Sequence, residues 1–348
     1  MMSAALGTEP LPTYYHIELA HAAHKLVSEV RPIQAGQQVV ITGDTASDER
    51  VLNAVAGAVY TAGGLPTILR YITLPSPMLP PPLPVSQAVA SADVWFDFSV
   101  AYQLYSPAYQ AAIDHGCIYV CLTGMDVDML VRTVGRVAYP PIQAMARRIY
   151  QMSQAAESVH VTSPAGTDLW MKVDKAGDSF WEPAPATGGF PQMLGGQSGF
   201  MAYRENYEGR LVFDGALWPP AELGLLHQPV QLSLRNGLIQ DIRGGGEALI
   251  FQRWLDSFHH PQAYLMDHAC YGFNPGVTRP SGRILEDERV FGCMQFGIGA
   301  TAYGSPAHTD GVVLNPSIWL DGVQIEDNGK YIHPELVQFC HQMGAPGY

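Results

Sequence analysis

The sequence is poor in lysine and has no cluster of basic residues. Its 348 residues include 32 acidic and 19 basic side chains, which gives a formal net charge of −13. Only four of the basic residues are lysines, namely Lys25, Lys172, Lys175 and Lys330. A strongly acidic chain is repelled by phosphate backbones and by anionic lipid head groups. We therefore expect neither nucleic-acid binding nor polybasic attachment to a membrane.

Signals for secretion, membrane insertion and disulfide bonding are also missing. No basic residue precedes Lys25, so the charged start of a secretory signal is absent. The uncharged stretch 51–69 contains Asn, Gly and Pro residues, which suits a soluble helix and strand better than a bilayer-spanning helix. The five cysteines are odd in number and form no CxxC pair, which is typical of reduced thiols. These absences predict a cytoplasmic protein.

Short apolar segments alternate with helical patterns in the first half of the sequence. We expect four strands, at 38–42, 66–72, 93–98 and 117–122. A helix with Ser47 as its N-cap follows the first strand, another begins at Ser106-Pro107, and a long one spans about 141–156. Strands separated by such helices predict a doubly wound parallel sheet. Residues 1–157 are therefore expected to form an α/β domain, although no GxGxxG or GxxxxGKS/T phosphate loop is present.

The second half, residues 158–348, is rich in hairpin signals. Asn236-Gly237 and Asp321-Gly322 each separate two short apolar segments, and such dipeptides favour type I′ turns. A single helix is expected at 247–258. The sequence thus predicts a C-terminal β-rich (α+β) domain, which also carries the most informative polar residues.

Two histidines and one carboxylate in this half form a candidate metal site, so we expect it to be a metal-binding domain. His308 and Asp310 are two residues apart, so on an extended segment both side chains point to one face. His268 lies between two apolar, strand-like segments. Such a set suits a mononuclear iron(II) site with open positions. The alternatives are a turn or surface pair for His308 and Asp310, and a buried imidazole bonded to a backbone carbonyl for His268.

Several blocks resemble the aminopeptidase T family of metallopeptidases. These blocks are 159–169, 190–215, 287–297 and His308-Thr309-Asp310, in that order. The resemblance covers most of the chain and implies an α/β domain followed by a β-rich one. This sequence departs from the peptidases at three positions, because Gln197 and His268 replace glutamates and Cys293 replaces a histidine. The resemblance therefore implies that the two-metal site of those peptidases is dismantled here.

The remaining residues are similar to the 2,5-dihydroxypyridine 5,6-dioxygenase branch of the same scaffold. That resemblance implies that His268, His308 and Asp310 are the ligands of Fe(2+). The block Leu104-Tyr105-Ser106-Pro107 looks like the substrate-side loop of that branch, with Tyr105 in place of a histidine acid/base. A tyrosine, with a pKa near ~10, can donate a hydrogen bond but is a poor base at neutral pH.

We therefore expect an iron(II)-dependent, extradiol-type ring-cleaving dioxygenase that acts with O2 on a hydroxylated aromatic or N-heterocyclic, dihydroxypyridine-like compound. The resemblance also implies a homo-oligomer. The candidates for catalysis and substrate contact are Tyr105, Gln197, Ser198 and Thr309. The rival hypothesis is a metal-dependent hydrolase of the aminopeptidase or amidase kind, in which a zinc-bound water is the nucleophile. A scaffold that binds a small molecule without turnover is a third alternative, and a serine hydrolase fits worse because Gly196-Gln197-Ser198-Gly199 matches only half of GxSxG.

Overall fold

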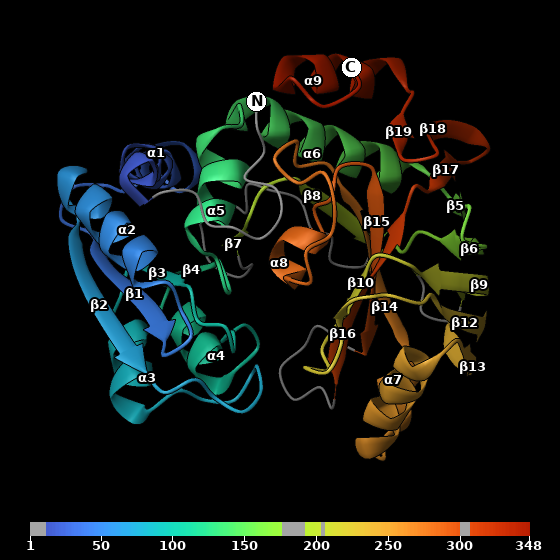
Figure 1. Ribbon diagram of the computed structural model, residues 1–348, viewed down its shortest axis with the longest axis horizontal. Coiled ribbons are helices and arrows are strands. Elements are labelled where there is room, and N and C mark those ends of the chain that lie inside the picture. The colour runs from blue at the N-terminus through green and yellow to red at the C-terminus, as the bar shows by residue number, and fades with distance from the viewer. Residues whose placement is uncertain (1–11, 176–191, 203–205, 300–306) are drawn as a thin grey trace. The chain divides into compact units, whose positions relative to one another are not determined.

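The computed structural model describes residues 12–175, 192–202, 206–299 and 307–348 (Figure 1). The chain divides into two units, Met1–Tyr139 with Pro183–Leu194 and Pro140–Glu182 with Gly195–Tyr348. Helix α6 (Tyr139–Ala155) falls almost wholly in the second unit. It is held there by the sheet of that unit, since Ser198 Oγ donates a hydrogen bond to the Ala146 carbonyl oxygen (2.9 Å). The chain thus first passes from one unit to the other at the start of α6, whereas the boundary expected from the sequence, after residue 157, lies just beyond the end of this helix. That expected boundary stays a prediction.

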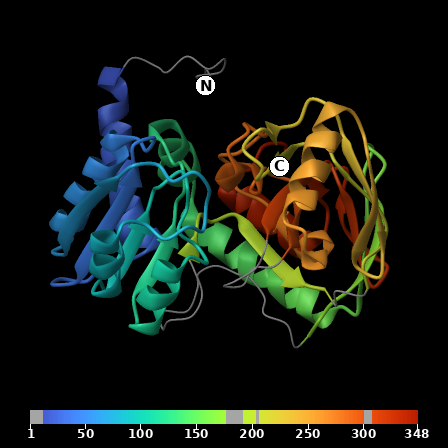
Figure 2. The same ribbon diagram turned by 90° about the horizontal axis from the view of Figure 1, so that it is seen from below.

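The first unit is a doubly wound α/β fold, as the sequence predicts. Its parallel sheet has the strand order β2-β1-β3-β4-β7. The strands are β1 (Gln38–Asp44), β2 (Leu65–Tyr71), β3 (Val94–Asp97), β4 (Ile118–Cys121) and β7 (Gln192–Met193). The α-helices are α1 (Pro12–Lys25), α2 (Glu49–Thr61), α3 (Leu83–Ala90), α4 (Pro107–Asp114) and α5 (Val127–Leu130). Helices α1 and α2 cover one face of the sheet, and α3 and α4 cover the other (Figures 1 and 2).

One local detail of this unit differs from the sequence prediction. The N-cap of α2 is Asp48 and not Ser47, because the Asp48 carboxylate accepts the backbone N–H of Arg50 (3.0 Å). Ser47 Oγ instead donates to the Phe98 carbonyl oxygen (3.0 Å). Both residue types are good N-caps, so the sequence pattern alone did not separate two neighbours.

Two buried aspartates fix the loop that leads to Tyr105. Asp44 ends β1 and Asp97 ends β3, the neighbouring strands at which the order of the sheet reverses direction. Asp44 Oδ2 accepts the Val100 N–H (2.9 Å), and Asp97 Oδ2 accepts the Gln103 N–H (3.0 Å). Burial raises the pKa of Asp97 above its ordinary value. The loop after β3 is thus anchored at the carboxyl end of the sheet, where open α/β sheets usually carry functional residues.

The second unit is built from two antiparallel sheets, as expected for a β-rich domain. Their orders are β11-β10-β16-β15-β14-β8 and β13-β12-β9-β6-β5-β17-β18-β19. The first sheet contains β8 (Gln197–Met201), β10 (Ala216–Trp218), β11 (Gly224–Leu225), β14 (Met266–Gly272), β15 (Cys293–Gly299) and β16 (His308–Leu314). The second contains β5 (Ser158–Thr162), β6 (Asp168–Lys172), β9 (Glu208–Phe213), β12 (Val230–Arg235), β13 (Leu238–Arg243), β17 (Ser317–Leu320), β18 (Val323–Asp327) and β19 (Lys330–Tyr331). The helices beside α6 are α7 (Gly246–Ser257), α8 (Ile284–Asp287) and α9 (Pro334–Met343).

The hairpins and the helix expected in this half are confirmed. Asn236 (φ +51°) and Gly237 (φ +70°) join β12 to β13, and Asp321 (φ +47°) and Gly322 (φ +81°) join β17 to β18. Positive φ at both central residues is what a type I′ turn requires. Helix α7 matches the expected 247–258 to within one residue at each end.

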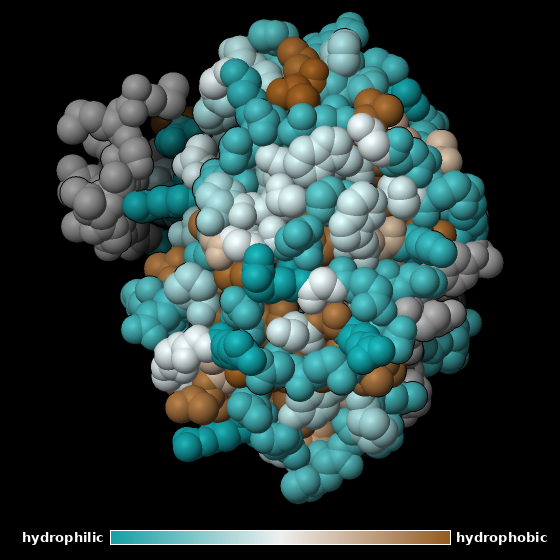
Figure 3. Space-filling view, turned by 90° about the vertical axis from the view of Figure 1, so that its right-hand side faces the viewer, coloured by the Kyte–Doolittle hydropathy of each residue, from teal (hydrophilic) through white to brown (hydrophobic). Residues whose placement is uncertain are grey.

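The two sheets pack face to face, and one of them has a polar outer side. The Phe213 ring of β9 lies where a Cβ on Gly311 of β16 would be, at 2.4 Å from its nearest ring atom, so the sheets meet closely. On the outer side of the eight-stranded sheet, His160 stacks on Trp170 with 4.0 Å between ring centroids. Figure 3 shows hydrophilic and intermediate residues there with scattered hydrophobic ones. No helix in the described part of the chain is long and apolar enough to cross a membrane.

Candidate metal centre

Three neighbouring strands bring His268, His308 and Asp310 together. His268 lies on β14, and His308 and Asp310 lie on one face of β16, as their spacing predicts. Asp310 contacts both imidazoles, with its Oδ1 3.3 Å from His268 Nε2 and its Oδ2 3.1 Å from His308 Nε2. One nitrogen or oxygen atom of each residue lies within 4.8 Å of the other two, and all three side chains are buried. The three residues that the sequence indicates as candidate metal ligands therefore lie side by side in the fold.

A β-bulge aims His268 at this cluster. Met266 pairs with Ile298 and Ala269 with Phe296, so Asp267 and His268 together face only one residue of β15, Gly297. Bulges of this kind redirect a side chain without ending the sheet. A Cβ on Gly297 would lie 2.3 Å from His268 Cε1, which no real side chain tolerates. The glycine thus provides the space that the imidazole occupies.

The second imidazole nitrogen of His268 is held by Asp267. Asp267 is fully buried, and its Oδ2 lies 3.0 Å from His268 Nδ1. Burial disfavours the charged imidazole, but the neighbouring carboxylates of Asp267 and Asp310 outweigh it and raise the pKa of His268 to about 10. The charges of His308 and His268 in turn lower the pKa of Asp310 in spite of its burial. The pocket therefore favours positive charge beside Asp310.

The donor atoms of the cluster fit a divalent cation. Asp310 Oδ1 accepts no hydrogen bond within the described residues, although His268 Nε2 is 3.3 Å away. A divalent cation that displaces the Nε2 proton of His268 would lie between Nε2 and Oδ1, with the Nδ1 proton still directed to Asp267. A nitrogen–oxygen donor set of this kind suits first-row divalent metals. A carboxylate behind the ligating imidazole is the usual support of such ligands.

Gln197, a candidate catalytic residue, contacts Glu288, a buried residue whose charge interacts with that of Asp310. Its Nε2 donates to Glu288 Oε2 (3.3 Å), and Arg289 Nη1 donates to the same oxygen (2.9 Å). Burial and then the negative charge of Asp310 raise the pKa of Glu288 to about 7. Gln197 thus donates a hydrogen bond to a buried carboxyl group whose pKa depends in part on the charge of Asp310.

The hydroxyl groups of the other two candidates in this unit are engaged by backbone oxygens. Ser198 is fully buried and donates to the Ala146 carbonyl oxygen of α6. Thr309 Oγ1 donates to the Pro219 carbonyl oxygen (2.5 Å) and so ties β16 to the loop after β10. Adjacent residues of a strand point to opposite faces. Ser198 therefore faces away from the side of β8 that carries Gln197. Thr309 likewise faces away from the side of β16 that carries His308 and Asp310.

Tyr105 lies in the first unit, directly before the N-cap Ser106 of α4. Its backbone has φ +64°, a left-handed conformation that is uncommon for a bulky residue. Its ring meets Tyr109 edge to face at 6.0 Å between centroids. Conformations of this cost persist where the surrounding structure enforces them, and they concentrate at functional sites.

Sequence reasoning missed four residues around the cluster. They are Asp267, Glu288, Gln295 and Gly297. Asp267 could have been found from its position directly before His268, but the others lie 20 or more residues from His268 and have no local signature. Cys293, at the position of a peptidase histidine, is buried and points its thiol at the carbonyl oxygens of Asp287 and Glu288. All five cysteines are buried and free of disulfides.

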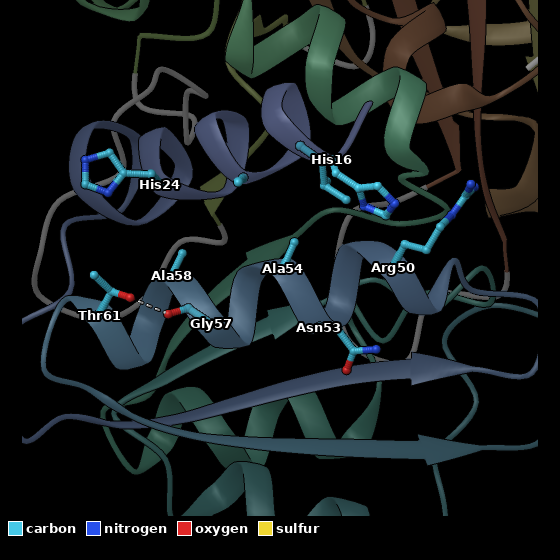
Figure 4. Close-up of a pocket in the computed structure, with 10 residues that line it drawn as sticks. His16, His24, Arg50, Asn53, Ala54, Gly57, Ala58 and Thr61 are labelled. Carbon is cyan, nitrogen blue, oxygen red and sulfur yellow. Dashed lines mark hydrogen bonds between the residues drawn. The ribbon is translucent and has the colours of Figure 1, made fainter. Parts of the chain in front are cut away.

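A separate groove lies in the first unit between α1 and α2 (Figure 4). It has a volume of about 670 Å³ and a floor of small residues that includes Ala54 and Gly57. His16 and His24 border it from α1, and Arg50 from α2. None of the site residues expected from the sequence lines this groove.

Comparisons with known proteins point to one family and one fold. A family model described as NicX, 2,5-dihydroxypyridine 5,6-dioxygenase, matches residues 21–333. The structure of 2,5-dihydroxypyridine dioxygenase from Pseudomonas putida KT2440 superimposes with a TM-score of 0.76 at 19% identity, over 91% of this chain and 98% of that one. Wild-type AmpT from Thermus thermophilus, an aminopeptidase T, gives 0.67 at 14% identity, over 92% and 100%. No curated protein sequence matches the chain.

Proposed function

The chain belongs to the 2,5-dihydroxypyridine 5,6-dioxygenase family, and we propose that it is an iron(II)-dependent, extradiol-type dioxygenase that opens a dihydroxypyridine-like ring. The observation that carries this proposal is the convergence of His268, His308 and Asp310 in one buried cluster. Two imidazoles and one carboxylate leave positions open for further ligands, as non-haem iron oxygenases require. The family match supports the same chemistry.

The three side chains would hold the metal, and their neighbours would keep them in place. When bound, iron(II) supplies the redox chemistry by which triplet dioxygen reacts with a closed-shell ring. Asp267 keeps the Nδ1 proton of His268 directed away from Asp310, so Nε2 would be the atom that binds the metal. The low pKa of Asp310 keeps that carboxylate ionised at neutral pH. No proton has to leave Asp310 before it binds a cation.

Two further residues are proposed to act on the substrate. Gln197 would orient the ring through its carboxamide and position Glu288, whose pKa of about 7 suits proton exchange with a ring hydroxyl. Tyr105 would donate a hydrogen bond from its phenol. Ser198 and Thr309 would support the site through the backbone oxygens that they already bind.

The proposed reaction balances with the ring compound and O2 alone. One carbon–carbon bond of the ring beside a hydroxyl-bearing carbon breaks, and both atoms of O2 enter the product. The ring loses the four electrons that O2 gains. Neither an external reductant nor a nicotinamide site is required, in agreement with the absence of GxGxxG from the sequence.

Oxygen uptake after anaerobic metal loading tests the proposal. We expect the metal-free protein to consume O2 with a dihydroxypyridine, a hydroxypicolinate or a catechol-like acid after iron(II) is added, at one O2 per ring opened. Zinc should give no oxygen uptake, and His308→Ala should abolish it. Full turnover with zinc and no oxygen consumption would overturn the proposal and favour the hydrolase, for which the similarity of fold to AmpT speaks.

Assembly and location remain predictions of the sequence. A homo-oligomer is expected from the resemblance, and sedimentation velocity of the purified chain measures it directly. A cytoplasmic location is expected from the composition, and fractionation of the source cells tests it. Neither property enters the chemistry proposed for the cluster.

A further inference from the structure

Gln295 is a buried polar residue beside the cluster that the proposed chemistry does not use. It lies on β15, two residues before Gly297, and is 1% exposed. Its Nε2 is 3.1 Å from His268 Nε2, the imidazole atom that faces Asp310. Its Oε1 has no hydrogen-bond partner within the described residues. A buried amide oxygen without a donor costs free energy unless it serves another purpose.

We propose that the Gln295 side-chain oxygen is a fourth protein ligand of the metal. This inference rests on the proposed function, since it assumes that His268, His308 and Asp310 hold a divalent ion. In a six-coordinate ion with ligand bonds of about 2.1 Å, neighbouring ligand atoms lie about 3 Å apart. The spacings of 3.3 Å and 3.1 Å around Asp310 are of that size. The Gln295 amide, at 3.1 Å from His268 Nε2, continues the same spacing.

The amide needs only to turn over to make this contact. Without a metal, its N–H group lies 3.1 Å from His268 Nε2. A cation bound to Nε2 would repel this N–H dipole. Rotation of the amide by half a turn then directs Oε1 to the cation, and no hydrogen bond of Oε1 is lost because none exists among the described residues. Cys270, opposite Gln295 on β14, offers only a weak thiol donor.

A neutral fourth ligand has consequences for the chemistry. Two imidazoles, one carboxylate and one amide leave a divalent ion with a net charge of +1 and two open positions out of six. Amide oxygens are hard ligands that suit iron(II), manganese(II) and magnesium better than a soft ion. A substrate that binds through two adjacent atoms would then complete the coordination, so tight bidentate ligands are favoured over monodentate ones.

Cobalt(II) binding to the metal-stripped protein tests this inference without reference to turnover. Calorimetry gives the Kd, and the visible d–d absorption reports coordination number because bands strengthen when ligands are lost. We expect Gln295→Leu, which keeps the size and removes the oxygen, to raise the Kd at least about tenfold and to intensify the bands. Gln295→Glu, with a charged oxygen in the same place, should lower the Kd. Gln231→Leu, on β12 of the other sheet, is the matched control and should change neither.

The outcomes separate this inference from the function on which it rests. A Gln295→Leu variant with the wild-type Kd and spectrum overturns the fourth ligand. If that variant does not fold, a Gln295→Glu Kd equal to or weaker than wild type overturns it instead. Failure of the wild-type protein to bind cobalt(II), or unchanged binding by His308→Ala, contradicts the three-residue metal site itself. Weakened binding by His308→Ala together with unchanged binding by Gln295→Leu leaves the site intact and rejects only Gln295.

Discussion

The imidazole of His268 lies over the backbone of Gly297, in the space that a side chain there would fill. A Cβ on Gly297 would be 2.3 Å from His268 Cε1 and 2.5 Å from Nδ1. Gly297 also pairs with Asp310 on β16, so the same residue sits beneath two of the three candidate ligands. The space for the imidazole of His268 therefore depends on the absence of a side chain at position 297.

Gly297→Ala should weaken metal binding without unfolding the protein. The added methyl group cannot share space with the imidazole, so His268 must rotate out of the bulge and Nε2 leaves Asp310. We expect the Kd for cobalt(II) to rise at least about tenfold, measured by calorimetry on the metal-stripped protein. Gly57→Ala is the control, because a Cβ there meets no atom within 4 Å and Ala favours helix α2. Wild-type affinity in Gly297→Ala would show that the ring tolerates the crowding.

Asp267→Asn should also lower metal affinity, through the second nitrogen of His268. The amide keeps the size of the side chain but is a weaker acceptor, so the Nδ1 proton is held less firmly and the ring loses basicity. An increase of the Kd by about 10- to 100-fold is expected. Asp168→Asn is the matched control, since Asp168 also contacts a histidine, His160 (2.9 Å), but in the other sheet. Equal changes in both variants would mean that the effect is not specific to the metal pocket.

The pairing of His308 and Asp310 was predictable because it depends only on the two-residue period of a strand. The hairpin at Asn236-Gly237 was predictable for a similar reason, since a short dipeptide specifies its turn. Four of the five parallel strands of the first unit followed from short apolar segments between helices. In each case the information lies within a few neighbouring residues.

The direction of the His268 side chain could not be predicted in this way. It depends on a bulge, and the bulge depends on the register between β14 and β15, whose paired residues are more than 20 positions apart in the sequence. Gln295 was missed for the same reason, because nothing near it in the sequence marks it as a neighbour of His268. The prediction of Ser47 as the N-cap of α2 was wrong for a local reason, because the adjacent Asp48 has a similar N-cap propensity.

Tyr105 should show opposite effects on stability and activity. Its φ of +64° costs a bulky residue roughly 1–2 kcal/mol, a cost that glycine does not have. We expect Tyr105→Gly to raise the free energy of unfolding by up to ~1 kcal/mol in urea titrations and to reduce ring opening. Tyr105→Phe should keep the strain and the stability but lose activity, since only the hydroxyl is removed. Wild-type turnover by Tyr105→Phe would exclude the phenol as a hydrogen-bond donor to the substrate.

Glu326 should make the stability of the protein fall as the pH rises. It is fully buried on β18, neither carboxyl oxygen has a hydrogen-bond partner among the described residues, and burial raises its pKa well above the ordinary 4.5. The folded protein therefore binds this proton more tightly than the unfolded chain does. The contribution of this carboxyl group to the free energy of unfolding is complete below pH ~4.5. As the pH rises from there to the pKa of the folded state, the contribution falls by up to ~1.4 kcal/mol per pH unit. The stability of Glu326→Gln relative to wild type should thus increase between pH 5 and pH 8 in urea titrations. A constant difference across this range would mean that Glu326 is ionised in the fold.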